Sequence, residues 1–376
     1  MVRVSLAAVF VLSSCMADSA AAQVEREDMY VETEDGLSIF VRRVVDGRAE
    51  EDRGPFLLVN GGRPGVLASW DVDVPDPSVA ALLSEAGHTV YLMDARGFGR
   101  SDFTAEMADG AEDGPVAVRS HEVVRDIAAV VREIRRRHAD DDYLAALGWA
   151  TGSQWLGHYA SLYPDAFSHL IYYQGAYGGQ PGGWPFQDIA REDDAALLDR
   201  ARFPAFRCST AEQVVGRLAD EIDDEAFLDR YVELAMEGDE RAAEREPACF
   251  RFPSGPLADT LQLVNGRPLF DAGAIESHVL ILRSEHDFWS RAEDIAALQD
   301  HLDRAATVRI VELEGASHYV HLLPDERGTF VEAVLTFTAG KGPSSTGEPR
   351  SRNGAHTSLP TACSKAVSPC PRLATT

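Results

Sequence analysis

Five short stretches of the chain place glycine beside acid, amide, hydroxyl or histidine side chains, the residue types that serve nucleophilic and acid–base catalysis. They are residues 60–65, 94–102, 148–152, 283–287 and 314–318. Within them, His318 can accept and return a proton near neutral pH, and Asp287 can orient an imidazole and stabilise its cation. Position 150, between two glycines, is an alanine, whose methyl group cannot attack a carbonyl carbon.

Each of these stretches directly follows a predicted strand. Continuous or nearly continuous apolar runs at 55–59, 88–93, 143–147, 279–282 and 308–311 are typical of strands buried on both faces. A hairpin at 29–45 and a strand at 169–173 complete the set, and predicted helices at 80–86, 122–138, 153–163, 292–302 and 327–337 separate the strands. This alternation predicts an α/β fold with a doubly wound, mostly parallel sheet. Ligands bind at the carboxyl ends of such strands, where all five stretches fall.

With these motifs in this order, residues 29–337 resemble the α/β-hydrolase family. The family's oxyanion loop is similar to residues 60–65, with Asn60 in the place of histidine, and its Asp-x-Arg-Gly-x-Gly-x-Ser turn matches residues 94–101. The resemblance implies that Ala150 occupies the nucleophile position, usually serine, with Asp287 as the acid and His318 as the base. It also implies that the N–H groups of Gly62 and Thr151 form the oxyanion hole.

The alanine at the nucleophile position leaves three interpretations open. The sequence is an inactivated serine-to-alanine variant, a natural homologue that kept the pocket and lost acyl transfer, or an enzyme in which Asp287 and His318 activate water. Neither Thr151 nor Ser153 is an obvious replacement nucleophile. We therefore expect a hydrolase of the esterase, lactonase or amidase type, with a non-catalytic ligand-binding homologue as the alternative.

The substrate-binding candidates are Trp149, Trp289 and Arg63, which adjoin the catalytic positions. Their aromatic rings favour a small-molecule apolar or aromatic acyl substrate. No Cys/His cluster has zinc-ligand spacing, so we expect neither a metal nor a cofactor.

Residues 180–275 interrupt the alternation and are predicted to form a helical cap on a domain that spans residues 23–338. This segment is acidic and broken by proline and glycine, shows no buried strand, and has helical patterns at 211–221 and 225–236. Cys208 and Cys249 lie within it and could pair, which the sequence does not decide.

Both ends of the chain differ from the domain between them. Residues 1–22 read as an export signal, with Arg3, an apolar run at 4–12 and three alanines at 20–22, although residues 12–15 also resemble a lipoprotein box that would attach lipid to Cys15. The protein is therefore expected to be exported, either periplasmic or secreted, or held at the membrane by a lipid anchor. Residues 339–376 are rich in Gly, Ser, Thr and Pro and are predicted to be disordered.

Charge restricts the partners. The 376 residues include 35 Lys and Arg and 61 Asp and Glu, a formal net charge of −26. Such a chain repels phosphate backbones, so a nucleic-acid partner is not expected. The only long apolar run is the one near the N-terminus, which excludes a protein with several membrane spans. The oligomeric state is not indicated by the sequence.

Overall fold

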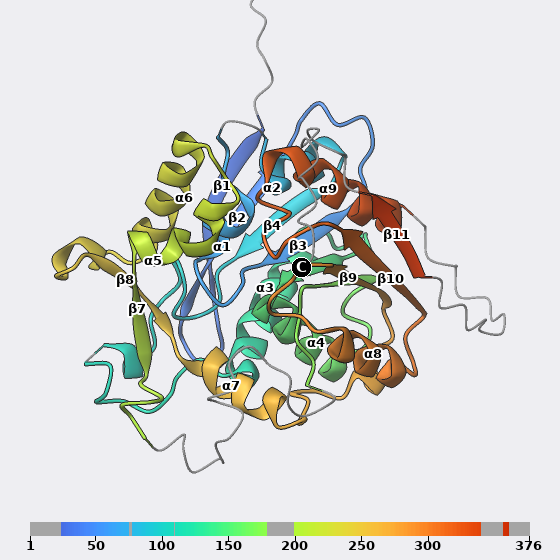
Figure 1. Cartoon of the computed structure of the whole chain (residues 1–376). Helices are drawn as coiled ribbons and strands as arrows, with labels where there is room; N and C mark the ends of the chain where they lie inside the picture. Colours follow the sequence, from blue (N-terminus) through green and yellow to red (C-terminus); the bar gives the residue numbers. More distant parts are fainter. Residues whose placement is uncertain (1–23, 75–76, 109, 179–198, 340–355, 361–376) are drawn as a thin grey trace, which may run out of the picture.

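Nine strands form one sheet in the order β1-β2-β4-β3-β5-β6-β9-β10-β11 (Figure 1). The computed structural model describes residues 24–74, 77–108, 110–178, 199–339 and 356–360. The strands are β1 (Glu25–Glu32), β2 (Ser38–Val45), β3 (Pro55–Val59), β4 (Thr89–Met93), β5 (Ala145–Trp149), β6 (His169–Tyr173), β9 (His278–Ser284), β10 (Thr307–Glu314) and β11 (His356–Pro360).

Only β2 runs opposite to the other strands of this sheet. β1 and β2 form an antiparallel hairpin, and β2 also pairs antiparallel with β4. Every other neighbouring pair in the sheet is parallel. The central strands β3, β5 and β6 are buried along their whole length, as their apolar sequences require. The predicted mostly parallel α/β sheet is confirmed.

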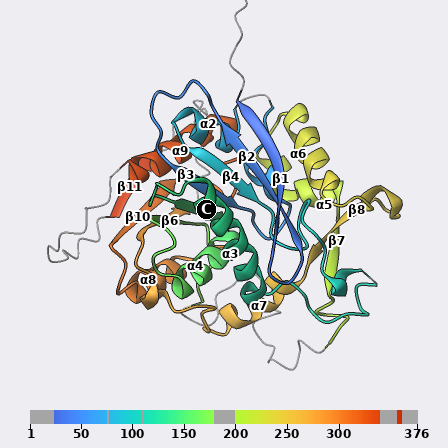
Figure 2. The ribbon, with the colours of Figure 1, turned by 180° about the vertical axis from the view of Figure 1, so that it is seen from behind.

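Helices cover both faces of the sheet. They are α1 (Val66–Trp70), α2 (Val79–Glu85), α3 (Ser120–Arg137), α4 (Thr151–Leu162), α8 (Ala292–His301) and α9 (Pro324–Thr338). α3 and α4 pack on each other and lie in front of the sheet in Figure 2, and α4 contacts β5 and β6. On β6, the ring of Tyr173 lies 4.7 Å from that of Phe330 on α9. Because successive strand residues point to opposite faces, Tyr172 points away from α9.

The inserted segment, described here from residue 199 to 275, contains β7 (Phe206–Thr210), α5 (Ala211–Val215), α6 (Glu225–Glu237), β8 (Cys249–Pro253) and α7 (Gly255–Val264). β7 and β8 form a separate antiparallel sheet, so the expectation of no buried strand here is wrong. The helix predicted at 225–236 is α6, whereas the one predicted at 211–221 is α5 followed by a 3-10 turn. A disulfide joins Cys208 on β7 to Cys249 on β8, with their Cα atoms 5.6 Å apart.

The two ends of the chain are described only in part. The expected export signal, residues 1–22, lies outside the described residues. In the expected disordered tail, His356–Pro360 instead forms β11, which extends the sheet beside β10; residues 340–355 and 361–376 are not described. Among the described residues, no helix is both long and apolar enough to cross a membrane.

Candidate active site

The turn between β5 and α4 holds Ala150 in an unusual backbone conformation, with φ 51° and ψ −108°. A non-glycine residue at positive φ costs roughly 1–3 kcal/mol and persists only where the surrounding structure enforces it. A Cβ atom on Gly148 would overlap the backbone of Gly152, and one on Gly152 would overlap the carbonyl oxygen of Asn60. The chain therefore passes from strand to helix within one residue, which is the geometry of a nucleophile elbow.

The hydroxyl group of Ser153, three residues after Ala150, is already engaged in the core. Ser153 is fully buried, and its Oγ donates to the carbonyl oxygens of Gly148 and Tyr173 while accepting the N–H of Tyr173. These contacts tie α4 to β5 and β6. Ser153 therefore stabilises the elbow and is not placed to act as a nucleophile.

Asp287 and His318, which are 31 residues apart in sequence, lie in direct contact. The Oδ1 atom of Asp287 is 2.8 Å from Nδ1 of His318 and also accepts the backbone N–H of Trp289 at 2.7 Å. The Asp287 side chain is fully buried and that of His318 is 8% exposed. Since a carboxylate only accepts hydrogen bonds, this contact places the proton on Nδ1 and leaves Nε2 of a neutral ring as the base.

Aromatic rings surround the His318 imidazole. Trp149, directly before the elbow, has its ring 5.1 Å from that of His318, and the Phe288 ring lies 4.6 Å away. Both rings limit the positions that the imidazole can adopt. Of the two predicted tryptophans, Trp149 therefore meets the histidine directly, whereas Trp289 contributes its backbone N–H to Asp287 and packs its half-buried ring against the core.

The loop after β3 approaches the same turn. A Cβ atom on Gly62 would lie 2.9 Å from Oγ1 of Thr151, so a side chain at this position would require the Thr151 side chain to move. Asn60, in the position of the family's histidine, donates through Nδ2 to the carbonyl oxygen of Gly61 and accepts the N–H of Ala95 through Oδ1. Asn60 thereby links the loops that follow β3 and β4, and Arg63 extends from this loop to Ser209 on β7.

The turn after β4 is structural. Asp94 is fully buried and accepts the backbone N–H groups of Val66 and Arg100. Burial raises the pKa of Asp94 to about 6. Gly99 has φ 50°, and any side chain there would overlap the Asp94 carboxyl group. The turn fixes α1 and the β3 loop relative to β4.

Gln174, directly after β6, was missed by the sequence reasoning. It has φ 54°, and its side-chain amide donates to Ser284 Oγ at 2.6 Å and to the carbonyl oxygen of Ser317 at 3.3 Å. These contacts connect the loop that carries Asp287 to the loop that carries His318. The available signal was a polar residue at the carboxyl end of a strand, but nothing in the sequence identified its partners.

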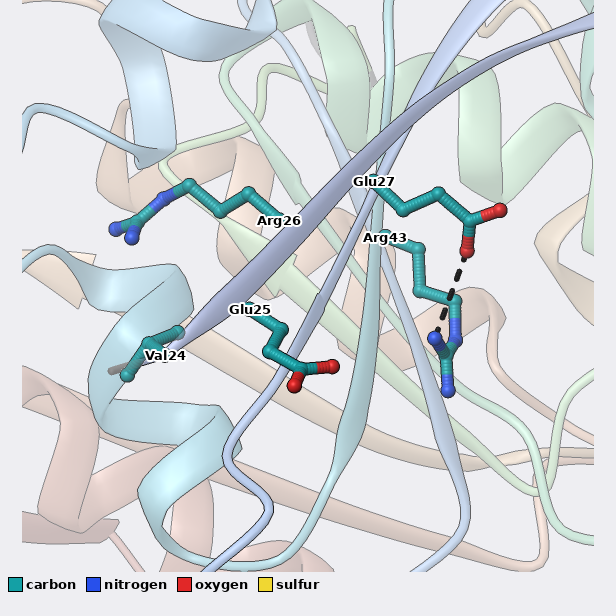
Figure 3. Close-up of a pocket in the computed structure, with 5 residues that line it drawn as sticks. All are labelled: Val24, Glu25, Arg26, Glu27 and Arg43. Atoms are coloured by element: carbon teal, nitrogen blue, oxygen red, sulfur yellow. Dashed lines mark ion pairs between the residues drawn. The ribbon is translucent and has the colours of Figure 1, made fainter. Parts of the chain in front are cut away.

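A separate pocket of about 510 Å³ lies against the β1–β2 hairpin (Figure 3). Its lining residues are Val24, Glu25, Arg26, Glu27 and Arg43, and Glu27 and Arg43 form an ion pair at 3.5 Å. None of the predicted site residues lines this pocket. Within the part of the chain that the structure describes, no group of His, Cys, Asp and Glu is arranged to hold a metal ion.

The sequence and the fold were compared with known proteins. Residues 77–325 match the family model described as serine aminopeptidase, S33. Similar solved structures include a thioesterase domain from the curacin biosynthetic pathway (17% identity, TM-score 0.56, 83% of this chain and 99% of that one). Others are E-2-(acetamidomethylene)succinate hydrolase (19%, 0.53, 84% and 100%) and an esterase from Exiguobacterium antarcticum (16%, 0.53, 84% and 100%). At these identities, the structures show a shared fold. No protein of curated function matches the sequence significantly.

Proposed function

Because the chain belongs to the serine aminopeptidase S33 family of α/β-hydrolases, we propose that it hydrolyses a carboxylic ester, lactone or amide. The reaction takes place where Asp287 and His318 meet the β5–α4 turn. The single observation that carries the proposal is the hydrogen bond from His318 Nδ1 to the buried Asp287 carboxylate. That contact prepares Nε2 to act as a base, which a purely structural histidine does not need.

The proposed reaction uses water in place of the missing serine. Nε2 of His318 takes a proton from a water molecule, and the resulting hydroxide attacks the carbonyl carbon of the substrate. Asp287 stabilises the imidazolium that forms. When the tetrahedral intermediate collapses, the imidazolium returns its proton to the departing alcohol or amine, so the reaction consumes one water and requires no cofactor or metal.

The N–H groups of Gly62 and Thr151 are the proposed donors to the oxyanion. Thr151 is the first residue of α4, where backbone N–H groups have no partner within the helix and the helix dipole favours negative charge. Among the described residues, neither of these two N–H groups donates a hydrogen bond. Since Gly62 and Thr151 lie next to each other in space, we propose that both backbone N–H groups donate to the same oxygen atom of the substrate.

An apolar or aromatic acyl group suits the surroundings of His318. Trp149, Phe288 and Tyr319 all place their rings within 5.4 Å of the His318 ring, measured between centroids. Such rings bind apolar groups through burial and through edge and face contacts.

Ala150 itself favours the second candidate function, a ligand-binding protein that has lost acyl transfer. The elbow persists although its central residue cannot form an acyl-enzyme. An inactivated variant of a serine enzyme has the same geometry. The two functions differ in one measurable property, hydrolysis that depends on His318.

The test is the rate of hydrolysis of chromogenic aryl esters by the wild type, by His318→Ala and by His286→Ala. His286 is a nearby exposed histidine and serves as the matched control. Water activation predicts that His318→Ala abolishes the rate above background and that His286→Ala preserves it. Equal rates for all three proteins would reject water activation and leave the ligand-binding function or an inactivated serine enzyme.

We also propose that the chain is exported, with cleavage after residues 20–22 or lipid attachment at Cys15. The Cys208–Cys249 disulfide supports an oxidising compartment. Mass spectrometry of the protein purified from cells identifies its N-terminal residue and tests this proposal. Protein that still begins at Met1 would reject it.

A further inference from the structure

We propose that Arg63 and Arg207 form a subsite for a carboxylate group carried by the substrate. The subsite lies where the loop after β3 meets the β7–β8 sheet. The inference rests on the proposed function, because it takes the ligand bound there to be the substrate of the Asp287–His318 site. It refines the proposed apolar acyl group to an acyl chain that ends in a carboxylate, which makes the substrate a monoester or monoamide of a short dicarboxylic acid.

The two arginines meet at one aromatic ring. The guanidinium carbon of Arg63 lies 5.6 Å from the centroid of the Phe252 ring, and that of Arg207 lies 5.0 Å from the same centroid. Arg63 also donates from Nη1 to Ser209 Oγ at 3.1 Å. Arg207 and Ser209 are two residues apart on β7, so they share one face of that strand. Both guanidinium groups therefore lie near the Phe252 ring, although they come from different parts of the chain.

No described carboxylate balances the charges of Arg63 and Arg207. Neither arginine forms an ion pair with any described residue, although the chain has 26 more acidic than basic residues. Other arginines of the inserted segment do pair: Arg230 with Asp73 and Glu233, Arg241 with Glu244, and Arg245 and Arg251 with Asp239. An anion bound between Arg63 and Arg207 would relieve the repulsion between them.

The surroundings of Arg207, including the charge of Arg63, also affect its pKa. Loss of solvent around its guanidinium, together with the nearby charge of Arg63, lowers the pKa of Arg207 to about 10. Arg207 still carries its charge at neutral pH. Both arginines keep part of their side chains accessible to solvent, so a ligand can reach them. Planar guanidinium groups suit a carboxylate, which can accept two parallel hydrogen bonds.

The position of Arg63 places the proposed carboxylate subsite close to the site where the substrate carbonyl would react. Arg63 directly follows Gly62, one of the two proposed oxyanion donors. On the other side, Arg217 stacks on Phe288 at 4.3 Å, and Phe288 contacts His318. A substrate whose carbonyl lies beside Gly62 therefore reaches Arg63 through a short chain.

Calorimetric titration of the wild-type protein tests the subsite without requiring turnover. The probes are the monoanilides of dicarboxylic acids from succinate to suberate, and the matched neutral probes carry a carboxamide in place of the free carboxylate. We expect the tightest-binding acid to bind at least about tenfold more tightly than its carboxamide, with an affinity that falls as salt is added. Equal affinities of acid and carboxamide across the series would overturn the proposal.

Variants localise the effect. Arg63→Gln and Arg207→Gln are each expected to lower the affinity for the acid about tenfold and to leave binding of the carboxamide unchanged. Arg241→Gln, which removes an exposed arginine of the same segment that already pairs with Glu244, is the control and is expected to change neither affinity. If all three variants bind the acid as the wild type does, the subsite is not formed by Arg63 and Arg207.

Failure of the subsite and failure of the hydrolase function give different results. If the acids bind through Arg63 and Arg207 but no His318-dependent hydrolysis is found, the subsite stands as part of a ligand-binding protein. If His318-dependent hydrolysis is found but acid and carboxamide bind equally, the hydrolase function stands and the carboxylate subsite is rejected.

Discussion

Asp287 holds the His318 ring through its hydrogen bond to Nδ1, so replacing only the charge of Asp287 tests its role. In the Ala150→Ser background, we expect Asp287→Asn to lower kcat by on the order of 10³–10⁴-fold with little change in KM, because an amide in this position no longer holds the correct His318 tautomer. Asp300→Asn, an exposed change on α8, is the control. Steady-state kinetics on an aryl ester measure the effect, and a loss of less than about tenfold would contradict it.

Some residues of the candidate site could be predicted from the sequence and others could not. Asp287 and His318 could be predicted because each follows an apolar strand and has a side chain that takes part in proton transfer. Gln174 could not be predicted, because its partner Ser284 lies more than 100 residues away in the sequence. Arg207 could not be predicted either, because the strand β7 that carries it was not expected. Sequence spacing does not report such contacts.

At the scale of elements, the β5–α4 elbow requires its glycines. We expect Gly152→Ala to lower the free energy of unfolding by about 1–3 kcal/mol or to prevent folding, because the new methyl group would overlap the carbonyl oxygen of Asn60. Gly328→Ala on α9 is the control, since nothing lies within 4 Å of its added Cβ and it should stabilise the helix by up to about 1 kcal/mol. Urea titration of both variants gives the comparison, and equal effects would contradict the account.

The disulfide between β7 and β8 closes a loop of 41 residues. The chain-entropy model gives a stabilisation of about 4 kcal/mol for such a loop. We therefore expect the Cys208→Ser/Cys249→Ser double variant to unfold at a lower urea concentration and to bind the dicarboxylate monoanilides more weakly, because Arg207 lies on β7. Unchanged urea stability under non-reducing conditions would show that the bridge is not formed in the protein.

Strands of the main sheet were predictable and those of the inserted segment were not. β3 and β6 have the predicted bounds because five consecutive apolar or aromatic residues can only be buried by a central strand. β7 reads Phe-Arg-Cys-Ser-Thr, and two of its five residues are exposed. It is held by pairing with β8 and by the disulfide, neither of which leaves an apolar run. β11 pairs through its backbone, which has no sequence signature.

For the whole molecule, the stability should fall in mild acid because of a buried histidine. His88 is 2% exposed, its Nδ1–H lies 3.2 Å from the carbonyl oxygen of Gly54, and burial lowers its pKa to about 4 from an ordinary value of 6.5. The folded protein favours the neutral imidazole of His88, so this residue does not destabilise the fold above pH 6.5. As the pH falls from 6.5 toward 4, the unfolded chain binds a proton at His88 that the folded protein does not, and the free energy of unfolding decreases.

Between pH 7 and pH 4, this proton uptake lowers the free energy of unfolding of the wild type by roughly 3 kcal/mol. His88→Phe lacks the titrating group, so we expect its free energy of unfolding to decrease by roughly 3 kcal/mol less than that of the wild type over the same pH range. Phenylalanine keeps the ring contacts with Phe56 and Tyr143. Urea titrations at several pH values measure both proteins, and parallel pH profiles would contradict a neutral buried His88.

The sheet order brings the pieces of the site together from residues 62 to 318. β3, β5 and β9 end at one edge of the sheet and are followed by the oxyanion loop, the elbow and Asp287, respectively. Parallel pairing places these loops together, so the fold and the meeting of Asp287 with His318 could be predicted from the sequence. The chemistry at the edge is decided by one side chain, that of residue 150.

Ala150→Ser therefore gives the most direct test of the central claim, that an acyl-transfer site surrounds position 150. The measurement is labelling by a fluorophosphonate together with the rate of aryl ester hydrolysis, for the wild type and for Ala150→Ser. We expect Ala150→Ser to be labelled at position 150 and to hydrolyse the ester with a burst of acyl-enzyme, whereas the wild type is not labelled and shows no burst. A folded Ala150→Ser protein that is neither labelled nor faster than the wild type would contradict the account.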